Sequence, residues 1–181
     1  AWATSSCSCT GCAVAEFAPP SAMSEVQALV ATWRKEGATV VLTNGVFDVF
    51  HVGHVAVLES AAAQGDKLIV AVNGDASVKR LGKGPDRPLN HESDRMAVLA
   101  ALRCVDAVVL FDEDTPLSVV KTLKPNVLVK GGDYDALEKD PLHPRYIVGS
   151  AEVRASGGRV VVVPVVPGKS STEMIERIRR T

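Results

Sequence analysis

The stretch Thr43–His54, TNGVFDVFHVGH, decides the fold because it joins an apolar run to a helical pattern. Residues 39–42 before it are apolar and β-branched, which indicates a buried strand, and Asn44-Gly45 indicates the turn that ends this strand. After Gly53 the chain is rich in Ala and Leu, which indicates a helix. Residues 67–72 are predicted to form the next strand. The strand–helix–strand unit therefore spans about 35 residues, which suits a right-handed parallel crossover.

Helix and strand patterns alternate on both sides of this unit. A helix is expected from Met23 to near Gly37, with an inner face of Val26, Leu29, Val30 and Trp33. Further strands are expected at 105–111, 127–129 and 160–166, and further helices at 92–103, 116–123, 151–155 and 172–180. Apolar strands without alternation belong to a parallel sheet covered on both faces. The predicted fold is α/β, a Rossmann-like, doubly wound, five-stranded parallel sheet with helices on both faces, in one domain over residues 23–181.

The composition excludes several classes of protein. The chain has 181 residues, of which 46% are hydrophobic and 23% charged, and its net charge is −1. A nucleic-acid-binding protein that relies on charge needs a basic surplus, which is absent from this sequence. Aromatic residues make up only 4%, which argues against a base-stacking sheet. A membrane-spanning helix needs about 20 apolar residues, whereas the longest apolar run, residues 96–102, is far shorter.

Three of the four cysteines lie near the start of the sequence. Residues 1–22 are small, polar and without periodicity, so we expect an unstructured leader or a cloning remnant. Cys7, Cys9 and Cys12 could bind a metal or form a disulfide, but structural zinc needs four ligands and no fourth lies nearby. Cys104 is expected to be a small buried hydrophobe. Nothing in this pattern demands an oxidising compartment or reads as a signal peptide, which makes the cytoplasm the expected location.

Two histidines at the start of the first crossover helix are the main candidates for chemistry. Ligands of a doubly wound sheet bind at the carboxyl ends of its strands, where His51 and His54 follow the first strand. The N-terminus of this helix offers free N–H groups to an anion, and the two imidazoles can donate hydrogen bonds to phosphate. A zinc pair and solvated loop histidines are the alternatives. Zinc pairs on a helix prefer a spacing of four, which favours phosphate.

Polar residues also follow the other strands and precede the last helix. Asn73 and Asp75 end the second strand, and Lys79 with Arg80 could reach a triphosphate or form a solvated basic edge. Segment 130–133, Lys-Gly-Gly-Asp, ends a further strand at the same edge of the sheet. Arg95 could simply pair with Glu92 on a helix surface. Residues 168–170 are not a Walker A motif, because position 163 is a valine rather than a glycine. Ser170, Ser171 and Thr172 could bind phosphate, and Ser170 with Glu173 could also form a capping box.

These motifs carry a resemblance to a known family. Residues 43–54 resemble the signature of the nucleotidylyltransferase superfamily, whose H-x-G-H histidines contact nucleotide phosphates. Four further blocks resemble its D-glycero-β-D-manno-heptose 1-phosphate adenylyltransferase branch: GDKLIVAVNGDASVKRL (65–81), RPLNHESDRMAVLAALRCVDAVVLF (87–111), LVKGGDY (128–134) and SSTEMIERI (170–178). The resemblance implies transfer of AMP from ATP to heptose 1-phosphate with Mg²⁺ and without a metal site in the protein, giving ADP-heptose for lipopolysaccharide or related glycans, and pyrophosphate.

The resemblance also implies roles for individual residues. His51, His54 and Lys79 are expected to be catalytic. Nucleotide contacts are expected from Thr43, Asn44, Gly45, Phe47, Asp48, Gly53, Asn73, Asp75, Arg95, Lys130, Gly131, Asp133, Ser170, Ser171 and Thr172. Connection 140–146, with His143 and Arg145, could hold the sugar phosphate or form a surface loop.

Three questions of function and assembly stay open in the sequence. Transfer to another small phosphorylated acceptor, such as glycerol 3-phosphate, from ATP or CTP is one alternative activity. Val165 weakens the cytidylyltransferase alternative, because related glycerol-3-phosphate cytidylyltransferases carry an arginine at that position. A non-catalytic nucleotide-binding protein is the other alternative. Nucleic acid and membrane are not expected partners, and a homodimer is expected by analogy alone.

Overall fold

The computed structural model describes residues 22–82, 84 and 86–180. The strands are β1 (Val40–Gly45), β2 (Lys67–Asn73), β3 (Ala107–Phe111), β4 (Val127–Gly131) and β5 (Arg159–Val163). The helices are α1 (Met23–Lys35), α2 (Val52–Ala62), α3 (Asp75–Arg80), α4 (Glu92–Ala100), α5 (Leu117–Leu123), α6 (Ser150–Ala155) and α7 (Ser171–Arg179). The cysteines at positions 7, 9 and 12 and the expected leader as far as residue 21 lie outside the described residues.

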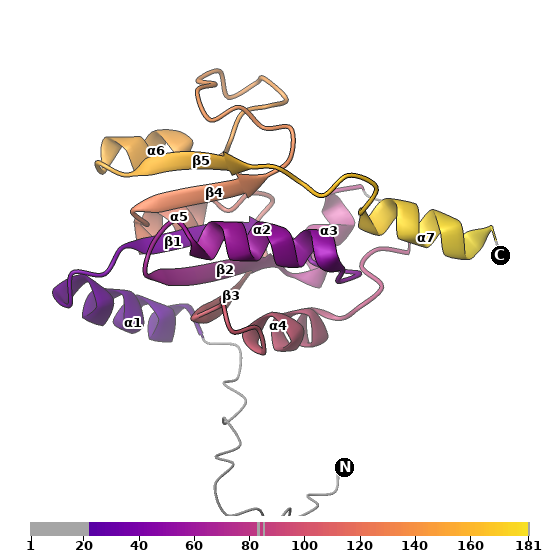
Figure 1. Ribbon diagram of the computed structural model, residues 1–181, viewed down its shortest axis with the longest axis horizontal. Helices are drawn as coiled ribbons and strands as arrows, with labels where there is room; N and C mark the ends of the chain where they lie inside the picture. Colours follow the sequence, from indigo (N-terminus) through magenta and orange to yellow (C-terminus); the bar gives the residue numbers. More distant parts are fainter. Residues whose placement is uncertain (1–21, 83, 85, 181) are drawn as a thin grey trace, which may run out of the picture.

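The strands form one parallel sheet in the order β3-β2-β1-β4-β5 (Figure 1). β1 lies at the centre of this order. It pairs with β2 from Val40–Lys67 to Gly45–Val72, and with β4 from Val41–Val127 to Thr43–Val129. The chain winds from β1 to one edge of the sheet and then crosses back to the other side of β1. This arrangement confirms the predicted doubly wound, five-stranded α/β fold.

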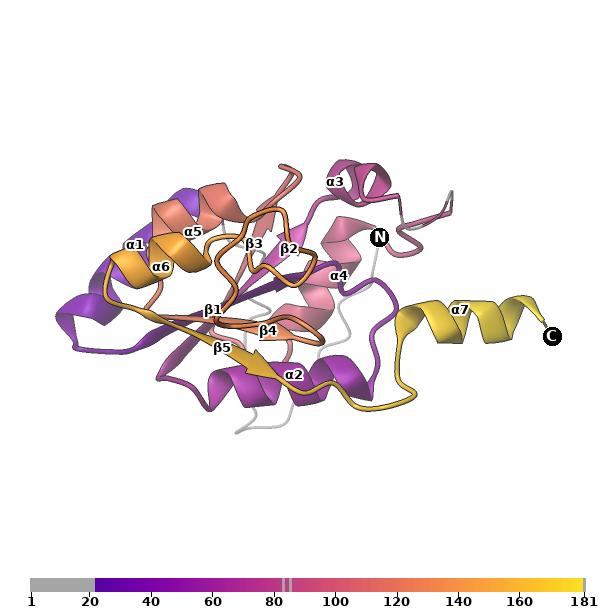
Figure 2. The ribbon, with the colours of Figure 1, turned by 90° about the horizontal axis from the view of Figure 1, so that it is seen from above.

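Helices cover both faces of the sheet, and each face has its own apolar core. On one face α1, α5 and α6 pack against strand residues that include Val40, Leu42 and Leu128. On the other face α2 and α4 pack against residues that include Val41 and Val70. Figure 2 shows α1, α5 and α6 together on the side of the sheet opposite α2. Neighbouring β1 residues thus point into different cores, which explains the continuous apolar run in this strand.

Several element boundaries differ from the prediction. β1 continues to Gly45, three residues beyond the apolar run, and α4 ends at Ala100 rather than near Arg103. β5 ends at Val163 because Pro164 follows, and proline has no N–H to donate to a sheet ladder. The predicted elements also lack helix α3, which spans Asp75–Arg80.

Two residues are less buried than predicted. Leu29 was expected on the inner face of α1 but is 39% exposed, so this part of the prediction was wrong. Cys104 is half-buried rather than fully buried, and it packs against the core beneath α2 and α4. Burial raises the pKa of its thiol, which therefore stays protonated at neutral pH.

Helix α7 lies apart from the two layers of helices. It projects beyond the carboxyl ends of the strands (Figures 1 and 2), and Ile175 is its one residue with a buried side chain among those described. Its first turn nevertheless touches the body of the protein, as described below. No helix in the described part of the chain has the length and apolar character needed to cross a bilayer.

The core beneath α1 and α5 sets the first testable prediction. Leu42 is fully buried, and Leu42→Ala should lower the free energy of unfolding by about 2–5 kcal/mol through lost burial and a residual cavity. Leu137→Ala is the matched control, because Leu137 is 81% exposed and the same truncation should cost less than about 0.5 kcal/mol. Urea denaturation followed by circular dichroism measures both. Equal losses in the two variants would contradict this assignment of the core.

Candidate active site

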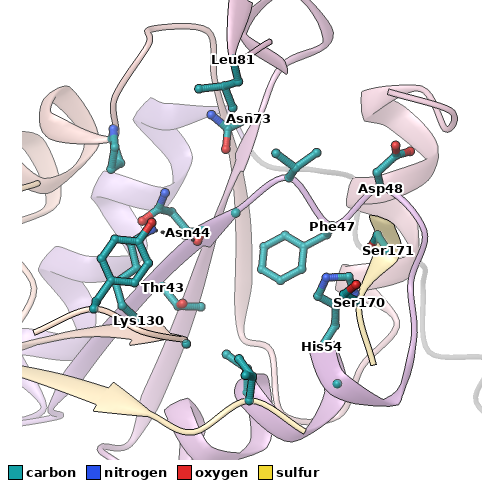
Figure 3. Close-up of a pocket in the computed structure, with 18 of the residues that line it drawn as sticks. Thr43, Asn44, Phe47, Asp48, His54, Asn73, Leu81, Lys130, Ser170 and Ser171 are labelled. Carbon is teal, nitrogen blue, oxygen red and sulfur yellow. Dashed lines mark hydrogen bonds between the residues drawn. The ribbon is translucent and has the colours of Figure 1, made fainter. Parts of the chain in front are cut away.

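A cavity of about 550 Å³ opens at the carboxyl ends of the strands, next to β1 (Figure 3). Connections that leave β1 and β4 towards opposite edges of the sheet create a crevice at this point. Fourteen of the residues singled out in the sequence line it: Thr43, Asn44, Gly45, Phe47, Asp48, His51, Gly53, His54, Asn73, Lys130, Gly131, Ser170, Ser171 and Thr172. The topology thus brings four distant segments of sequence together, while the roles of these residues in binding ligands stay predictions.

The turn after β1 places an aromatic ring beneath the histidines. Phe47 has a positive φ of 52°, which lets the chain curl back so that its ring lies against Gly45. A Cβ at Gly45 would lie 3.1 Å from Cε2 of Phe47, so a larger residue would press on the ring. The Phe47 ring meets His54 edge-on, with ring centroids 5.3 Å apart. This packing fixes one side of the His54 imidazole.

His51 and His54 form a stacked pair at the N-terminus of α2. Their ring centroids are 4.0 Å apart and their planes differ by 23°. His51 is the N-cap residue of α2, and its Nδ1 accepts a hydrogen bond from the backbone N–H of Gly53 at 3.1 Å. Because Nδ1 is an acceptor, the neutral ring carries its proton on Nε2, which can donate to a ligand.

Gly53 allows this cap to form. A Cβ at position 53 would lie 2.8 Å from Cε1 of His51 and 3.1 Å from the carbonyl oxygen of Lys169. Only glycine lets the histidine ring and the segment before α7 approach the first turn of α2 together. The spacing H-x-G-H thus has a steric cause.

The first turn of α7 borders the same cavity. Ser170 is the N-cap residue of α7 and its Oγ accepts from the N–H of Glu173 at 3.1 Å, as the capping pattern predicted. The Oγ of Ser171 donates to the carbonyl oxygen of Val49 at 3.1 Å, which ties α7 to the loop before α2. Figure 3 shows Ser170 and Ser171 beside His54. The N-termini of α2 and α7 therefore both present backbone N–H groups to this end of the cavity.

Lys130 supplies a cation at the end of β4. Its Nζ lies 3.4 Å from the carbonyl oxygen of Asn44 and 5.5 Å from the centre of the Tyr134 ring. Tyr134, Tyr146 and Val148 come from the connection between β4 and α6 and line the cavity on this side. This side is therefore the aromatic and aliphatic part of the cavity.

Four residues expected in the site do not line the cavity. Lys79 and Asp75 border a separate depression between α3 and the start of α4. Arg95 is buried beneath the cavity floor, and Asp133 is exposed, with its carbonyl oxygen accepting from Nε of Arg145 at 2.9 Å. The sequence could not distinguish these positions, because it shows only that each residue follows a strand or begins a helix. His143 and Arg145 also lie outside the cavity, on an exposed connection.

Arg95 has a structural set of partners. Its side chain is fully enclosed, and it donates to the carbonyl oxygens of Val46 at 2.6 Å and Asn90 at 3.0 Å and to Oδ1 of Asp75 at 2.8 Å. Burial, the strongest influence on the pKa of Asp75, would raise it, but hydrogen bonds from Arg95 and His91 outweigh burial and lower it. Arg95 thus holds the turn after β1 from below.

Asp48 lines the cavity, but its carboxylate binds the neighbouring loop. The side chain is fully buried, Oδ1 accepts from the N–H groups of Leu89 and Asn90 at 2.8 Å each, and Oδ2 lies 2.6 Å from Nε of Arg87. The side-chain amide of Asn90 donates to the carbonyl oxygen of Asp48 in return. Asp48 and Arg95 therefore hold the turn and the connection between α3 and α4 in one arrangement.

Sequence reasoning missed several lining residues. Lys169 and Arg87 are cations at the cavity, and Tyr134, Tyr146 and Thr115 also line it. Lys169 directly precedes Ser170, the N-cap residue of α7. Its place next to a predicted phosphate-binding helix start was the signal that could have identified it. Nothing in the sequence indicated Arg87, because its place depends on the buried contact with Asp48.

The arrangement suits a polyanionic ligand. Two helix N-termini, the stacked histidines, and the cations Lys130, Lys169 and Arg87 surround the cavity. Within the described residues no group of three or more His, Cys, Asp or Glu side chains is placed to hold a metal ion. Among the alternatives for the histidine pair, the two helix N-termini and the three cations favour phosphate.

The protonation of His51 can be tested directly. Burial, assisted by the positive charge of Lys169, lowers the pKa of His51 below its ordinary value of 6.5. The unfolded chain therefore takes up this proton first, so the stabilising contribution of neutral His51 is complete above pH 6.5 and is lost as the pH falls through its folded pKa. NMR titration of the ring should show a midpoint below 6.5, and Lys169→Ala should raise it. Lys121→Ala, far from the ring, should not change it. A midpoint above 6.5 in the unaltered protein would contradict the assigned environment.

Comparison with known proteins extends these observations. The cytidylyltransferase-like family matches residues 42–177. Two similar proteins, each named "Bifunctional protein HldE", come from Azorhizobium caulinodans (51% identical over 168 residues, 91% of this chain and 33% of the relative) and Gluconobacter oxydans (51% identical over 147 residues, 81% of this chain and 29% of the relative). The chain thus spans about a third of the length of these relatives.

A solved structure shares the fold. The lipopolysaccharide core biosynthesis protein from Thermoplasma volcanium superposes with a TM-score of 0.54 at 26% identity, over 72% of this chain and 98% of that protein.

Proposed function

The chain belongs to the cytidylyltransferase-like family, and from that premise we propose that it is an adenylyltransferase that transfers AMP from ATP to D-glycero-β-D-manno-heptose 1-phosphate. The observation that carries the proposal is the anion-binding cavity with the stacked pair His51 and His54 between two helix N-termini. The heptose acceptor is supported by the resemblance of the four sequence blocks to those of heptose 1-phosphate adenylyltransferases. The structural similarity to a protein named for lipopolysaccharide core biosynthesis is consistent with that acceptor.

The chemistry requires little from the protein beyond positioning and charge. A sugar phosphate oxygen is already ionised at pH 7, so no general base is needed for it to attack the α-phosphorus of ATP. In the proposal, His51 and His54 donate hydrogen bonds to the α-phosphate as negative charge builds up on its oxygens. The lowered pKa of His51 leaves a neutral ring, whose Nε2–H remains available as a donor.

The departing pyrophosphate is assigned to the first turn of α7. Ser171 and Thr172, with the N–H groups of this turn and the adjacent Lys169, border the cavity beside the histidines. Lys169 takes the place that the sequence had given to Lys79, which lies outside the cavity. Nucleotide contacts from Thr43, Asn44, Gly45 and Lys130 remain part of the proposal, whereas Asp48 and Arg95 act by positioning the turn.

Magnesium enters the proposal as part of the substrate. The described residues offer no cluster of metal ligands at the cavity, and Mg²⁺ commonly binds substrate phosphates while keeping several waters. The ion would therefore arrive on ATP. The proposal further places the reaction in the cytoplasm, where ATP is available, and the expected homodimer stays a prediction.

A substrate panel tests the proposed reaction. Pyrophosphate release should be fastest with ATP and the β anomer of heptose 1-phosphate, and slower with CTP or with glycerol 3-phosphate, which are the alternative substrates left open by the sequence. In His54→Ala, kcat should fall by about 10²–10³, since one donor to the reacting phosphate is lost. The proposal is wrong if ATP binds without turnover on any sugar phosphate, or if pyrophosphate release in this variant equals that of the unaltered protein.

The assignment of Lys169 has its own test. Lys169→Ala should raise the KM for ATP or lower kcat by roughly tenfold or more, because a charged contact to phosphate is worth about 1.5–3 kcal/mol. Lys79→Ala serves as the matched lysine variant and should have a smaller effect, because its side chain lies outside the cavity. Steady-state kinetics with ATP as the varied substrate measure both. If Lys79→Ala had the larger effect, the contact with the triphosphate would be assigned to Lys79 instead of Lys169.

A further inference from the structure

The residues that line the cavity fall into two chemical groups on opposite sides of β1. On the β4–β5 side lie Lys130, Gly131, Tyr134, Tyr146, Val148 and Val165, most of them aromatic, aliphatic or glycine. On the β2–β3 side lie Asn73, Leu81, Arg87, Asp114 and Thr115, most of them polar. Figure 3 shows Asn73 and Leu81 at one end of the cavity and Lys130 at the other. His51 and His54 follow β1, and Figure 3 shows His54 beside Ser170 and Ser171.

The two groups suit different parts of the substrates. Aromatic and aliphatic side chains provide stacking surfaces for a nucleotide base. The amide of Asn73, the carboxylate of Asp114 and the hydroxyl of Thr115 can instead hydrogen-bond the hydroxyl groups of a sugar. Asp114 is oriented by Arg80, whose Nε lies 2.6 Å from its Oδ1, and the amide nitrogen of Asn73 donates to Ser77 at 3.0 Å. The β2–β3 side is therefore a polar surface.

Arg87 is the cation on this polar side. Its side chain is only 10% exposed although it lines the cavity, and Nε lies 2.6 Å from Oδ2 of Asp48. Within the described part of the chain this ion pair is its only side-chain interaction, and no hydrogen bond satisfies Nε. A guanidinium carries five N–H donors in a planar fork that matches phosphate oxygens in pairs. Asp48 thus holds the guanidinium in place, and the donors not used by this pair remain for an anion.

We propose that Arg87 binds the phosphate of the acceptor, and that Asn73, Asp114 and Thr115 bind hydroxyl groups of the same sugar phosphate. This inference rests on the proposed function, and it names the part of the cavity that takes the second substrate. The ligand class is a phosphate monoester of a polyol. ATP also carries phosphates, but the first turn of α7 and Lys169 already provide a site for the pyrophosphate that leaves ATP.

The reaction itself sets a condition for the site of the acceptor. An oxygen of the acceptor phosphate forms a bond to the α-phosphorus of ATP, while the bond from that phosphorus to the bridging oxygen of pyrophosphate breaks. The electron pair leaves on pyrophosphate, and no proton is transferred. Attacking and leaving oxygens lie roughly in line, so the acceptor must approach from the side opposite the departing pyrophosphate. Arg87 belongs to the connection between α3 and α4, and Lys169 belongs to the connection between β5 and α7, so the two cations come from different segments of the chain.

The test compares the two substrates in variants of the polar side. Arg87→Lys keeps a cation beside the buried Asp48, so folding should be retained, but it loses the planar fork. The KM for heptose 1-phosphate should rise roughly tenfold to a hundredfold, and the KM for ATP should stay unchanged. Asp114→Asn is the second variant, because the Asp114 side chain is 72% exposed and its loss should not impair folding. It should raise the same KM by a smaller factor. Lys121→Ala, an exposed cation on α5, is the control.

Each outcome bears on the proposal. A rise in the KM for ATP, alone or together with that for the acceptor, would show that Arg87 binds the nucleotide and would overturn the inference. No change in either constant would also overturn it. Calorimetry with heptose 1-phosphate alone separates this inference from the proposed function. If the unaltered protein binds the sugar phosphate and Arg87→Lys weakens binding, the site stands even where no pyrophosphate is released. Equal binding by both proteins, or none by either, rejects it.

Discussion

The central position of β1 is the constraint on which the rest of the structure depends. This strand is hydrogen-bonded to β2 on one side and β4 on the other, and helices cover both of its faces. Polar side chains inside such a strand would lose water without gaining partners, so they can begin only where the strand emerges at its carboxyl end. The change from Leu42 to Thr43 and Asn44 marks that point. The chain departs from β1 and β4 in opposite directions there, which leaves the crevice that becomes the site.

Buried charges keep the site in one arrangement. Asp48 and Arg95 are both almost completely removed from water, a state that is costly unless each charge is paired and hydrogen-bonded. Their partners are mostly backbone groups of the turn after β1 and of the segment around Asn90. Charged side chains that bind backbone groups fix loops that have few apolar contacts of their own. The charged groups of Asp48 and Arg95 therefore hold the loops that form the site.

A net charge of −1 is compatible with a site for polyanions because charge is distributed unevenly. Lys130, Lys169 and Arg87 converge on one cavity, together with the N-termini of α2 and α7. Partial charges at helix N-termini do not appear in a count of ionisable residues. The low aromatic content is also compatible with a nucleotide site, since Tyr134 and Tyr146 both lie on one side of this cavity.

The sequence by itself determined the alternation of strands and helices along the chain, the parallel sheet and the motif at the end of β1. These features follow from local periodicity and from the positions of glycine and proline. It also placed Ser170 at a helix start, since capping is local. Only the tertiary structure decided that Lys169 rather than Lys79 reaches the cavity, that Arg95 lies beneath it, and that Arg87 joins it through Asp48. These outcomes depend on contacts between segments tens of residues apart, and neither residue type nor spacing along the chain specifies where such segments meet.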